Sequence, residues 1–363
     1  MKQDFSKLNK FNDEGLSFAE IKKDLKENSE GITPFGISYL DQSLEGIERS
    51  DLILIGAASG RGKTQLCSLI ASNALSLNKR VHFFALEAER FEIGKRLMFL
   101  LYAQAFYSDN DRPRIDGQLI YSRWRLNRYE EQFKKYDESV AAKFAMQNKN
   151  LKVFYRANDF GVDEFVASVA SVKNETDLVI LDHLNYFDFV GDNENKAISQ
   201  AVKAIRALQI NLKIPIMMAA HVRKKSLNDQ SLVPAIEEFH GSSDIFKVAT
   251  KTIMLAPCFE DGPSHLHKTF VQVGKHRHNG SVTKYTAKMT FNISENSYED
   301  AYEIGTLKDR GSKFDPVIVQ ADLPFWATGA TITPPSTSWS KKPERPAAPP
   351  SGKNYGGRPY RDN

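Results

Sequence analysis

The stretch Gly56-Ala-Ala-Ser-Gly-Arg-Gly-Lys-Thr64 directly follows the apolar run Leu52-Ile-Leu-Ile55, and the two together decide the fold class. An apolar strand, a glycine-rich loop and a helix predicted over residues 65–77 are typical of a loop that cradles phosphates. Small residues let backbone N–H groups approach a phosphate without Cβ clashes, and the positive end of the helix favours the bound charge. The sequence therefore predicts a nucleoside triphosphate site.

The last two residues of this loop have specific expected roles in binding the nucleotide. Lys63 can reach the β- and γ-phosphates, and the Thr64 hydroxyl can ligate magnesium. The predicted phosphate-binding residues are Ser59, Gly60, Arg61, Gly62, Lys63, Thr64 and Gln65.

Apolar runs alternate with helical patterns over most of the chain. Strands are predicted at residues 52–55, 81–86, 151–155, 178–181 and 214–220, and helices at 90–106, 162–172 and 195–211. Near-continuous apolar strands are typical of parallel sheets covered on both faces by crossover helices. We therefore expect an α/β fold with a mostly parallel sheet flanked by helices. From residue 252 the pattern turns to antiparallel-looking strands, at 252–255, 269–273 and 284–291, which predict a C-terminal antiparallel hairpin.

The two ends of the chain differ from this body. Ser17-Phe-Ala-Glu20 is a capping box that predicts a short helix over residues 18–27. Its narrow apolar stripe of Phe18, Ile21 and Leu25 is typical either of a helix that docks on a neighbouring subunit or of a frayed surface helix. Beyond residue 329 the sequence is rich in Pro, Gly, Ser and Lys, which predicts disorder. The expected division is an N-terminal arm (1–30), one large domain (31–328) and a basic tail (329–363).

Composition restricts the function classes. The chain has 363 residues and a net charge of +4, and its last 23 residues, with six Lys or Arg and two Asp or Glu, carry all of that charge. The body is therefore close to neutral and offers no general basic surface for nucleic acid. Neither a signal pattern nor a run of 18 apolar residues occurs, so we expect a soluble intracellular protein without a membrane contact. The charged excursion at 109–150 carries no recognisable chemistry.

Acidic residues close two of the predicted strands. Asp182 ends the strand at 178–181, where a carboxylate can approach magnesium at the carboxyl edge of the sheet. Glu87 ends the strand at 81–86 and could polarise an attacking water, with Glu89 as the competing candidate.

Cationic and imidazole side chains complete the candidate set. His221 closes the strand at 214–220 and could contact the γ-phosphate. Arg223, Lys224 and Lys225 are either a contact to a nucleic-acid backbone or solvated surface charge. Lys275 and Arg277 share one strand face, a geometry that suits cations inserted into the site of another subunit. Cys258 and the histidines at 265, 267, 276 and 278 lack a standard zinc spacing, so we expect no metal there.

With these motifs in this order, residues 31–291 resemble the ATPase domain of DnaB-type replicative DNA helicases within the RecA-like superfamily. The resemblance rests on the phosphate loop, Phe83-Phe-Ala-Leu-Glu87, Val179-Ile-Leu-Asp182, the segment from Ile214 to His221, Gly241-Ser-Ser243 and Lys275-His-Arg277. Two residues depart from the usual pattern. His221 stands where bacterial members usually have glutamine, and His183 stands where an aromatic residue is common.

The resemblance implies ATP and Mg²⁺ as cofactors and a hexameric ring with single-stranded DNA in its channel. It implies Glu87 as the catalytic carboxylate, His221, Lys275 and Arg277 as further catalytic residues, and a short linker helix in the N-terminal arm. Primase, a helicase loader or other replisome proteins are implied partners, in the cytoplasm of a bacterium or a phage-infected cell. Residues 1–30 leave no room for the N-terminal collar of the family, so we expect a compact phage-type member. A filament-forming recombinase and a regulatory ATPase that unwinds nothing remain alternatives.

Overall fold

The computed structural model describes residues 17–156, 159–189, 194–222, 231–239, 242–260 and 262–332. No helix among these residues is both long and apolar enough to span a membrane. The predicted tail lies outside the described residues from position 333 onward. The division at residues 30 and 328 stays a prediction.

One ten-stranded sheet organises the fold, with the strand order β10-β9-β8-β7-β6-β1-β5-β4-β2-β3. Six neighbouring strands are parallel: β1 (Leu52–Ala57), β2 (Val81–Ala85), β3 (Leu151–Tyr155), β4 (Leu178–Asp182), β5 (Ile216–His221) and β6 (Lys251–Pro257). Four strands continue the sheet in antiparallel fashion: β7 (Leu266–His276), β8 (Thr286–Asn292), β9 (Ser297–Lys308) and β10 (Lys313–Pro316). The predicted fold class is thereby confirmed.

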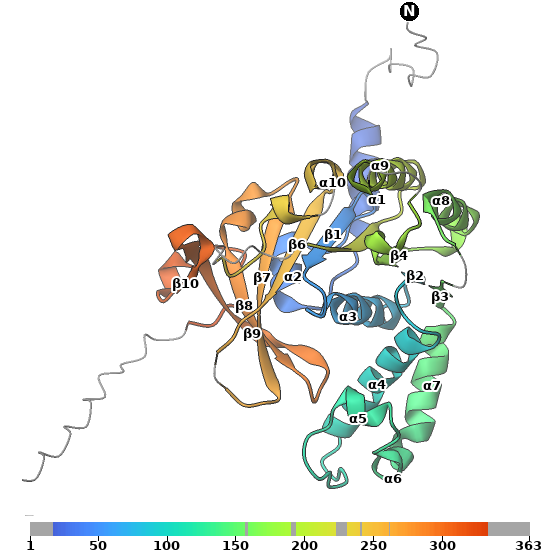
Figure 1. Ribbon diagram of the computed structural model, residues 1–363, viewed down its shortest axis with the longest axis vertical. Coiled ribbons are helices and arrows are strands. Elements are labelled where there is room, and N and C mark those ends of the chain that lie inside the picture. Colours follow the sequence, from blue (N-terminus) through green and yellow to red (C-terminus); the bar gives the residue numbers. More distant parts are fainter. Residues whose placement is uncertain are drawn as a thin grey trace, which may run out of the picture. The chain divides into compact units, whose positions relative to one another are not determined.

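Helices cover both faces of the parallel part (Figure 1). One face carries α3 (Lys63–Ser76) and α4 (Glu92–Tyr107), and the other carries α8 (Val162–Ser171), α9 (Glu194–Leu212) and α10 (Ser242–Val248). Helix α2 (Ser38–Leu44) packs on the antiparallel strands β7 and β9. Strand β1 shows why its sequence is continuously apolar. Ile53 and Ile55 pack into the core on the α3 face, whereas Leu52 and Leu54 pack on the α9 face. Because successive side chains point to opposite faces, a strand covered on both sides must be apolar at every position.

One expectation about pairing is wrong. The sequence predicted that the change to antiparallel strands begins at residues 252–255. Strand β6, which contains them, runs parallel to β1 on one side and antiparallel to β7 on the other. The change therefore comes one strand later, between β6 and β7.

The N-terminal helix α1 (Phe18–Gly31) begins with the predicted capping box, in which Ser17 and Glu20 satisfy each other's backbone N–H groups. None of its residues is buried. Its side chains Phe18, Ile21 and Leu25 are 76%, 45% and 57% exposed. The described residues therefore leave the apolar stripe of this helix open.

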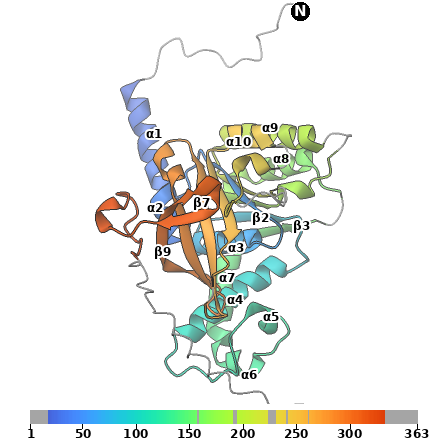
Figure 2. The same ribbon diagram turned by 60° about the vertical axis from the view of Figure 1, so that its left-hand side comes forward.

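The excursion at 109–150 folds onto α4 as a small helical unit containing α5 (Tyr121–Trp124), α6 (Glu130–Phe133) and α7 (Asp137–Asn148) (Figure 2). Its Tyr129, Phe133 and Tyr136 are buried against Phe99 and Phe106 of α4, and the half-buried Trp124 packs against the same cluster. These side chains form an apolar cluster distinct from the two that flank the sheet.

Candidate functional site

The phosphate loop connects β1 to α3 at the carboxyl edge of the parallel strands. Gly60 and Gly62 have φ angles of 70° and 87°, a left-handed conformation that strains any residue with a Cβ. Gly62 is also the N-cap of α3, whose first residue is Lys63. Two of the three glycines of the motif are therefore required by the backbone itself.

Lys63 is held inside this loop. Its Nζ donates hydrogen bonds to the carbonyl oxygens of Ala57 (3.1 Å) and Ala58 (3.2 Å), and it lies 2.8 Å from Nδ1 of His221. Burial lowers the pKa of Lys63, and the carboxylates of Asp182 and Glu87 act in the opposite direction. The ammonium thus stands between the loop and the neighbouring strand ends before any phosphate is bound.

The register of the parallel strands brings the predicted acidic and imidazole side chains to this loop. Ala57 at the end of β1 is paired with His221 at the end of β5, and Ala85 at the end of β2 with Asp182 at the end of β4. The N–H of Leu86 donates to the carbonyl of Asp182, which places Glu87 one residue beyond that contact. Four strands from distant parts of the sequence therefore end at a single site.

Asp182 and Thr64 have the features of a magnesium site. Asp182 is 2% exposed, and its Oδ1 has no hydrogen-bond partner among the described residues. Burial raises the pKa of Asp182, whereas a hydrogen bond with the Thr64 side chain acts against this rise. A hard divalent cation prefers such oxygen ligands, so the residues present fit the predicted metal.

Glu87 lies beside two histidines. Its Oε2 is 3.0 Å from Nε2 of His183, and the rings of His183 and His221 have their centroids 4.0 Å apart. His183 is 1% exposed, and burial lowers its pKa to about 3, so the ring is neutral. The sequence noted His183 only as a departure from a pattern, because nothing in its local context shows that it meets Glu87.

A cavity of about 880 Å³ contains all seven predicted residues of the phosphate loop. Its lining also includes Glu87, Glu89, Asp182 and His221. Pockets that hold small molecules typically measure about 300–1,000 Å³, so a nucleotide fits in size. Both candidate carboxylates therefore face the same space, and the choice of Glu87 over Glu89 stays a prediction.

The excursion supplies a wall of this cavity that the sequence did not predict. Tyr121, Ser122, Arg125 and Leu126 line it from α5 and the turn that follows. Arg96 of α4 joins this wall to the loop, because it lies over the Tyr121 ring at 5.2 Å and donates to Oε1 of Gln65 at 3.2 Å. A segment that had shown no chemistry thus contributes one cation, Arg125, and an aromatic ring, Tyr121, to the nucleotide cavity.

Lys275 and Arg277 lie at the far end of β7, and their surroundings differ. Lys275 Nζ donates to the carbonyl oxygens of Phe246 (2.6 Å) and Lys247 (3.1 Å) at the end of α10. Arg277 is exposed, and its backbone N–H donates to Thr250. Burial and the cations Arg277 and Arg206 lower the pKa of Lys275. Lys275 is thus engaged within its own chain, whereas Arg277 projects into solvent; their roles at another subunit stay predictions.

The three predicted DNA-contacting residues, Arg223, Lys224 and Lys225, lie outside the described residues, as does Gly241.

The family model for the DnaB-like helicase C-terminal domain matches residues 31–300. The chain belongs to this family.

Its similarity to individual members is distant. It is 24% identical over 311 residues to the replicative DNA helicase DnaB of Buchnera aphidicola subsp. Baizongia pistaciae, covering 78% of this chain and 61% of that one. It is 23% identical over 264 residues to the DnaB of Mycoplasma pneumoniae, covering 66% of this chain and 52% of that one. The chain thus spans little more than half the length of these relatives.

A solved DnaB-like replicative helicase, described together with its interactions with primase, superposes with a TM-score of 0.58 at 18% identity. The superposition covers 79% of this chain and 67% of that one. This likeness supports the fold of a DnaB-like ATPase domain.

In this DnaB-like domain, the site residues that the sequence did not predict share one property. Tyr121, Arg125 and His183 reach the site through tertiary packing and belong to no local motif. An alternation of cations with aromatic residues over 121–125 is present in the sequence, but the same pattern is typical of exposed helices.

Proposed function

We propose that this chain is the motor of a ring-forming replicative DNA helicase that couples ATP hydrolysis to movement along single-stranded DNA. The observation that carries the proposal is the convergence of Lys63, Asp182, Glu87 and His221 on one phosphate loop in a chain of the DnaB-like family. Phosphoryl transfer needs mainly positioning and charge stabilisation, and these four side chains supply both.

Each residue has a stated part in hydrolysis. The loop N–H groups and Lys63 bind the phosphates, while Thr64 and Asp182 hold Mg²⁺, which neutralises charge on the β- and γ-phosphate oxygens when bound. Glu87 orients the attacking water and accepts its proton. The ring of His221 contacts the ammonium of Lys63, so its position can change when the γ-phosphate leaves.

The site of one subunit is completed by a neighbour in this proposal. Arg277 is exposed at the end of β7 and supplies the cation that stabilises the transition state across the interface. Because the ring places one active site at each interface, hydrolysis and assembly depend on each other.

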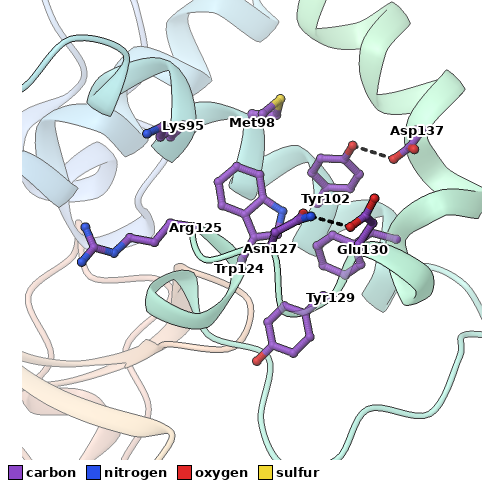
Figure 3. Close-up of a pocket in the computed structure, with 10 residues that line it drawn as sticks. Lys95, Met98, Tyr102, Trp124, Arg125, Asn127, Tyr129, Glu130 and Asp137 are labelled. Atoms are coloured by element: carbon purple, nitrogen blue, oxygen red, sulfur yellow. Dashed lines mark hydrogen bonds between the residues drawn. The ribbon is translucent and has the colours of Figure 1, made fainter.

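The neighbour is joined through α1. A cleft of about 370 Å³ opens on the excursion, lined by Met98, Tyr102, Trp124, Tyr129 and Phe133 among others (Figure 3). At its rim Tyr102 donates to Asp137 and Asn127 donates to Glu130, and the cations Lys95 and Arg125 also line it. A cleft lined by aromatic side chains suits the exposed apolar stripe of α1 from a second copy of this chain.

DNA is contacted by the loops that follow Asp182 and His221. Arg223, Lys224 and Lys225 bind the phosphates of the DNA backbone. Primase and a loader are proposed as further partners, and the cytoplasm as the place of action.

The proposal is tested by measuring ATP hydrolysis with and without single-stranded DNA, and unwinding of a forked duplex by the same preparation. We expect DNA to stimulate hydrolysis and closed rings to appear in electron micrographs. Hydrolysis without any response to DNA would instead favour a regulatory ATPase, and open helical polymers on DNA would favour a filament-forming recombinase.

A matched pair of variants addresses the DNA contacts. Replacing Arg223, Lys224 and Lys225 by alanine should weaken binding and reduce the slope against log salt by up to about 0.7 for each phosphate that is no longer neutralised. Deleting residues 341–363 should leave the ATP-dependent part of binding in place, because a basic tail adds only a nucleotide-independent term. The reverse result would contradict DNA binding in a central channel.

A further inference from the structure

Glu87, His183 and His221 are the one group of three metal-ligating side chains among the described residues whose ligand atoms lie within 4.8 Å of one another. The phosphate loop, Thr64 and Asp182 account for ATP and Mg²⁺ without His183. The imidazole of His183 is therefore a donor at the centre of the site that the proposed hydrolysis does not use.

His183 has unfilled hydrogen-bonding capacity. It is 1% exposed, and neither of its ring nitrogens has a hydrogen-bond partner of acceptable geometry among the described residues. Its Nε2 nevertheless lies 3.0 Å from Oε2 of Glu87, and its ring faces that of His221 at 4.0 Å between centroids. A buried imidazole without a partner carries a desolvation cost that a bound ion would relieve.

The donor set distinguishes between cations. Two imidazole nitrogens and one carboxylate oxygen are the ligands of many zinc sites that keep a fourth position open, whereas magnesium prefers oxygen donors and retains its waters. Glu87 side-chain exposure of 44% leaves the carboxylate room to move the short distance that zinc coordination requires.

We propose that Glu87, His183 and His221 form a zinc-binding site, distinct from the magnesium site at Thr64 and Asp182. Zinc at this position engages the carboxylate that orients water and the imidazole that contacts Lys63, so it arrests ATP hydrolysis. The arrest rests on the proposed function, whereas zinc binding rests only on the three ligands.

Lys63 gives the site a testable charge dependence. Its ammonium lies 2.8 Å from Nδ1 of His221, so it repels a divalent cation and competes for that nitrogen. A unit positive charge a few ångströms from a divalent ion opposes its binding strongly, because the effective dielectric near a protein surface is well below that of water. Lys63→Ala should therefore bind zinc at least about tenfold more tightly, a gain that a merely structural role of His183 would not produce.

The experiment titrates zinc into the full chain without nucleotide, in buffer that contains magnesium, against a chromophoric chelator. We expect one zinc per chain in the wild type and a loss of affinity of at least about tenfold in His183→Phe and in Glu87→Gln. The exposed histidines at 267 and 278 provide controls, and His267→Ala and His278→Ala should bind zinc as the wild type does. Cobalt substitution and its visible spectrum report the coordination directly.

Unchanged zinc affinity in both His183→Phe and Glu87→Gln, with folding verified by circular dichroism, would overturn the site. So would a loss of binding in the control variants alone. Inhibition of hydrolysis by zinc in the wild type supports the arrest. Zinc binding that depends on His183 but leaves hydrolysis unchanged would uphold the zinc site and contradict the proposed role of Glu87.

Discussion

The side-chain ammonium of Lys63 lies 2.8 Å from Nδ1 of His221, so the phosphate loop and the end of β5 are in contact before nucleotide arrives. Two backbone carbonyls of the same loop also accept from this ammonium. In the proposed function a phosphate replaces these three partners, and we expect its arrival to be transmitted to His221.

Lys63→Ala should weaken nucleotide binding by about 10- to 150-fold, the value of a hydrogen bond to a charged group. The fold should be retained, because the side chain leads into the nucleotide cavity and not into an apolar core. Fluorescent-nucleotide titration and near-ultraviolet circular dichroism measure the two effects. Lys152→Ala is the control, since Lys152 pairs with Glu175 on the surface. Wild-type ATP hydrolysis by Lys63→Ala would contradict the assigned site.

Glu87→Gln should differ in kind from Lys63→Ala. The amide keeps the size of the carboxylate but cannot accept a proton, so ATP still binds while turnover falls by about 10²- to 10⁴-fold. Binding and steady-state hydrolysis are measured on the same preparation. Glu89→Gln is the matched variant in the same cavity. If Glu89→Gln instead gives the loaded but inactive state, the assignment at the end of β2 is off by two residues.

Arg277→Ala should lower hydrolysis by up to about 10³- to 10⁵-fold through the neighbouring active site. Subunits with Arg277→Ala keep an intact phosphate loop, and subunits with Lys63→Ala keep an intact cation. Mixed rings should therefore contain some interfaces with both parts and regain partial activity, measured as hydrolysis against mixing ratio. If mixed rings form and no ratio restores activity, Arg277 serves its own subunit.

Replacing Phe18, Ile21 and Leu25 together by serine should weaken subunit association without unfolding the chain. All three side chains are at least 45% exposed, so folded-state packing changes little. Sedimentation velocity measures the oligomer, and thermal unfolding measures the chain. A control with Lys23→Ser and Glu27→Ser changes the polar side of the same helix, where these two side chains form an ion pair. Equal association of both variants would identify α1 as a frayed surface helix.

Lys251→Ala should reduce the free energy of unfolding by about 3–5 kcal/mol. Lys251 is completely buried and donates to Asp51 at 2.7 Å and to the Gly46 carbonyl at 2.8 Å. Truncation leaves the buried Asp51 carboxylate without its counter-charge. Urea denaturation measures the loss, and Lys152→Ala, at an exposed ion pair, should cost only about 0–1 kcal/mol. A similar small loss for Lys251→Ala would contradict a structural role for this pair.

The site could be predicted from sequence where its chemistry follows from local pattern and strand direction. Lys63 and Thr64 stand in a contiguous motif, and Asp182 and His221 each end an apolar run. Parallel strands bring their carboxyl ends to one edge, so these residues had to meet. The meeting of Glu87 with the residues predicted to hold magnesium follows from the same reasoning, and the roles of these residues stay predictions.

Other features carry no such local signal. Strand β6 is apolar at residues 253–256 whichever way it pairs, so its direction could not be predicted. Much of β9 is half-exposed and polar, which is why it went unpredicted. Arg125 lines the nucleotide cavity only because α5 folds back over α4, a contact set by the aromatic side chains of the excursion.

That excursion has its own apolar cluster, centred on Phe99, Phe106, Phe133 and Tyr136, apart from the clusters that hold the sheet. Segments with separate apolar clusters can open as separate cooperative units, with a smaller free energy than global unfolding. The nucleotide cavity is therefore bounded on one side by Lys63 at the start of α3 and Asp182 at the end of β4, and on the other by the helical wall that carries Arg125. We expect this wall to open with a smaller free energy than the sheet. Nucleotide binding should therefore slow amide hydrogen exchange most clearly in residues 109–136.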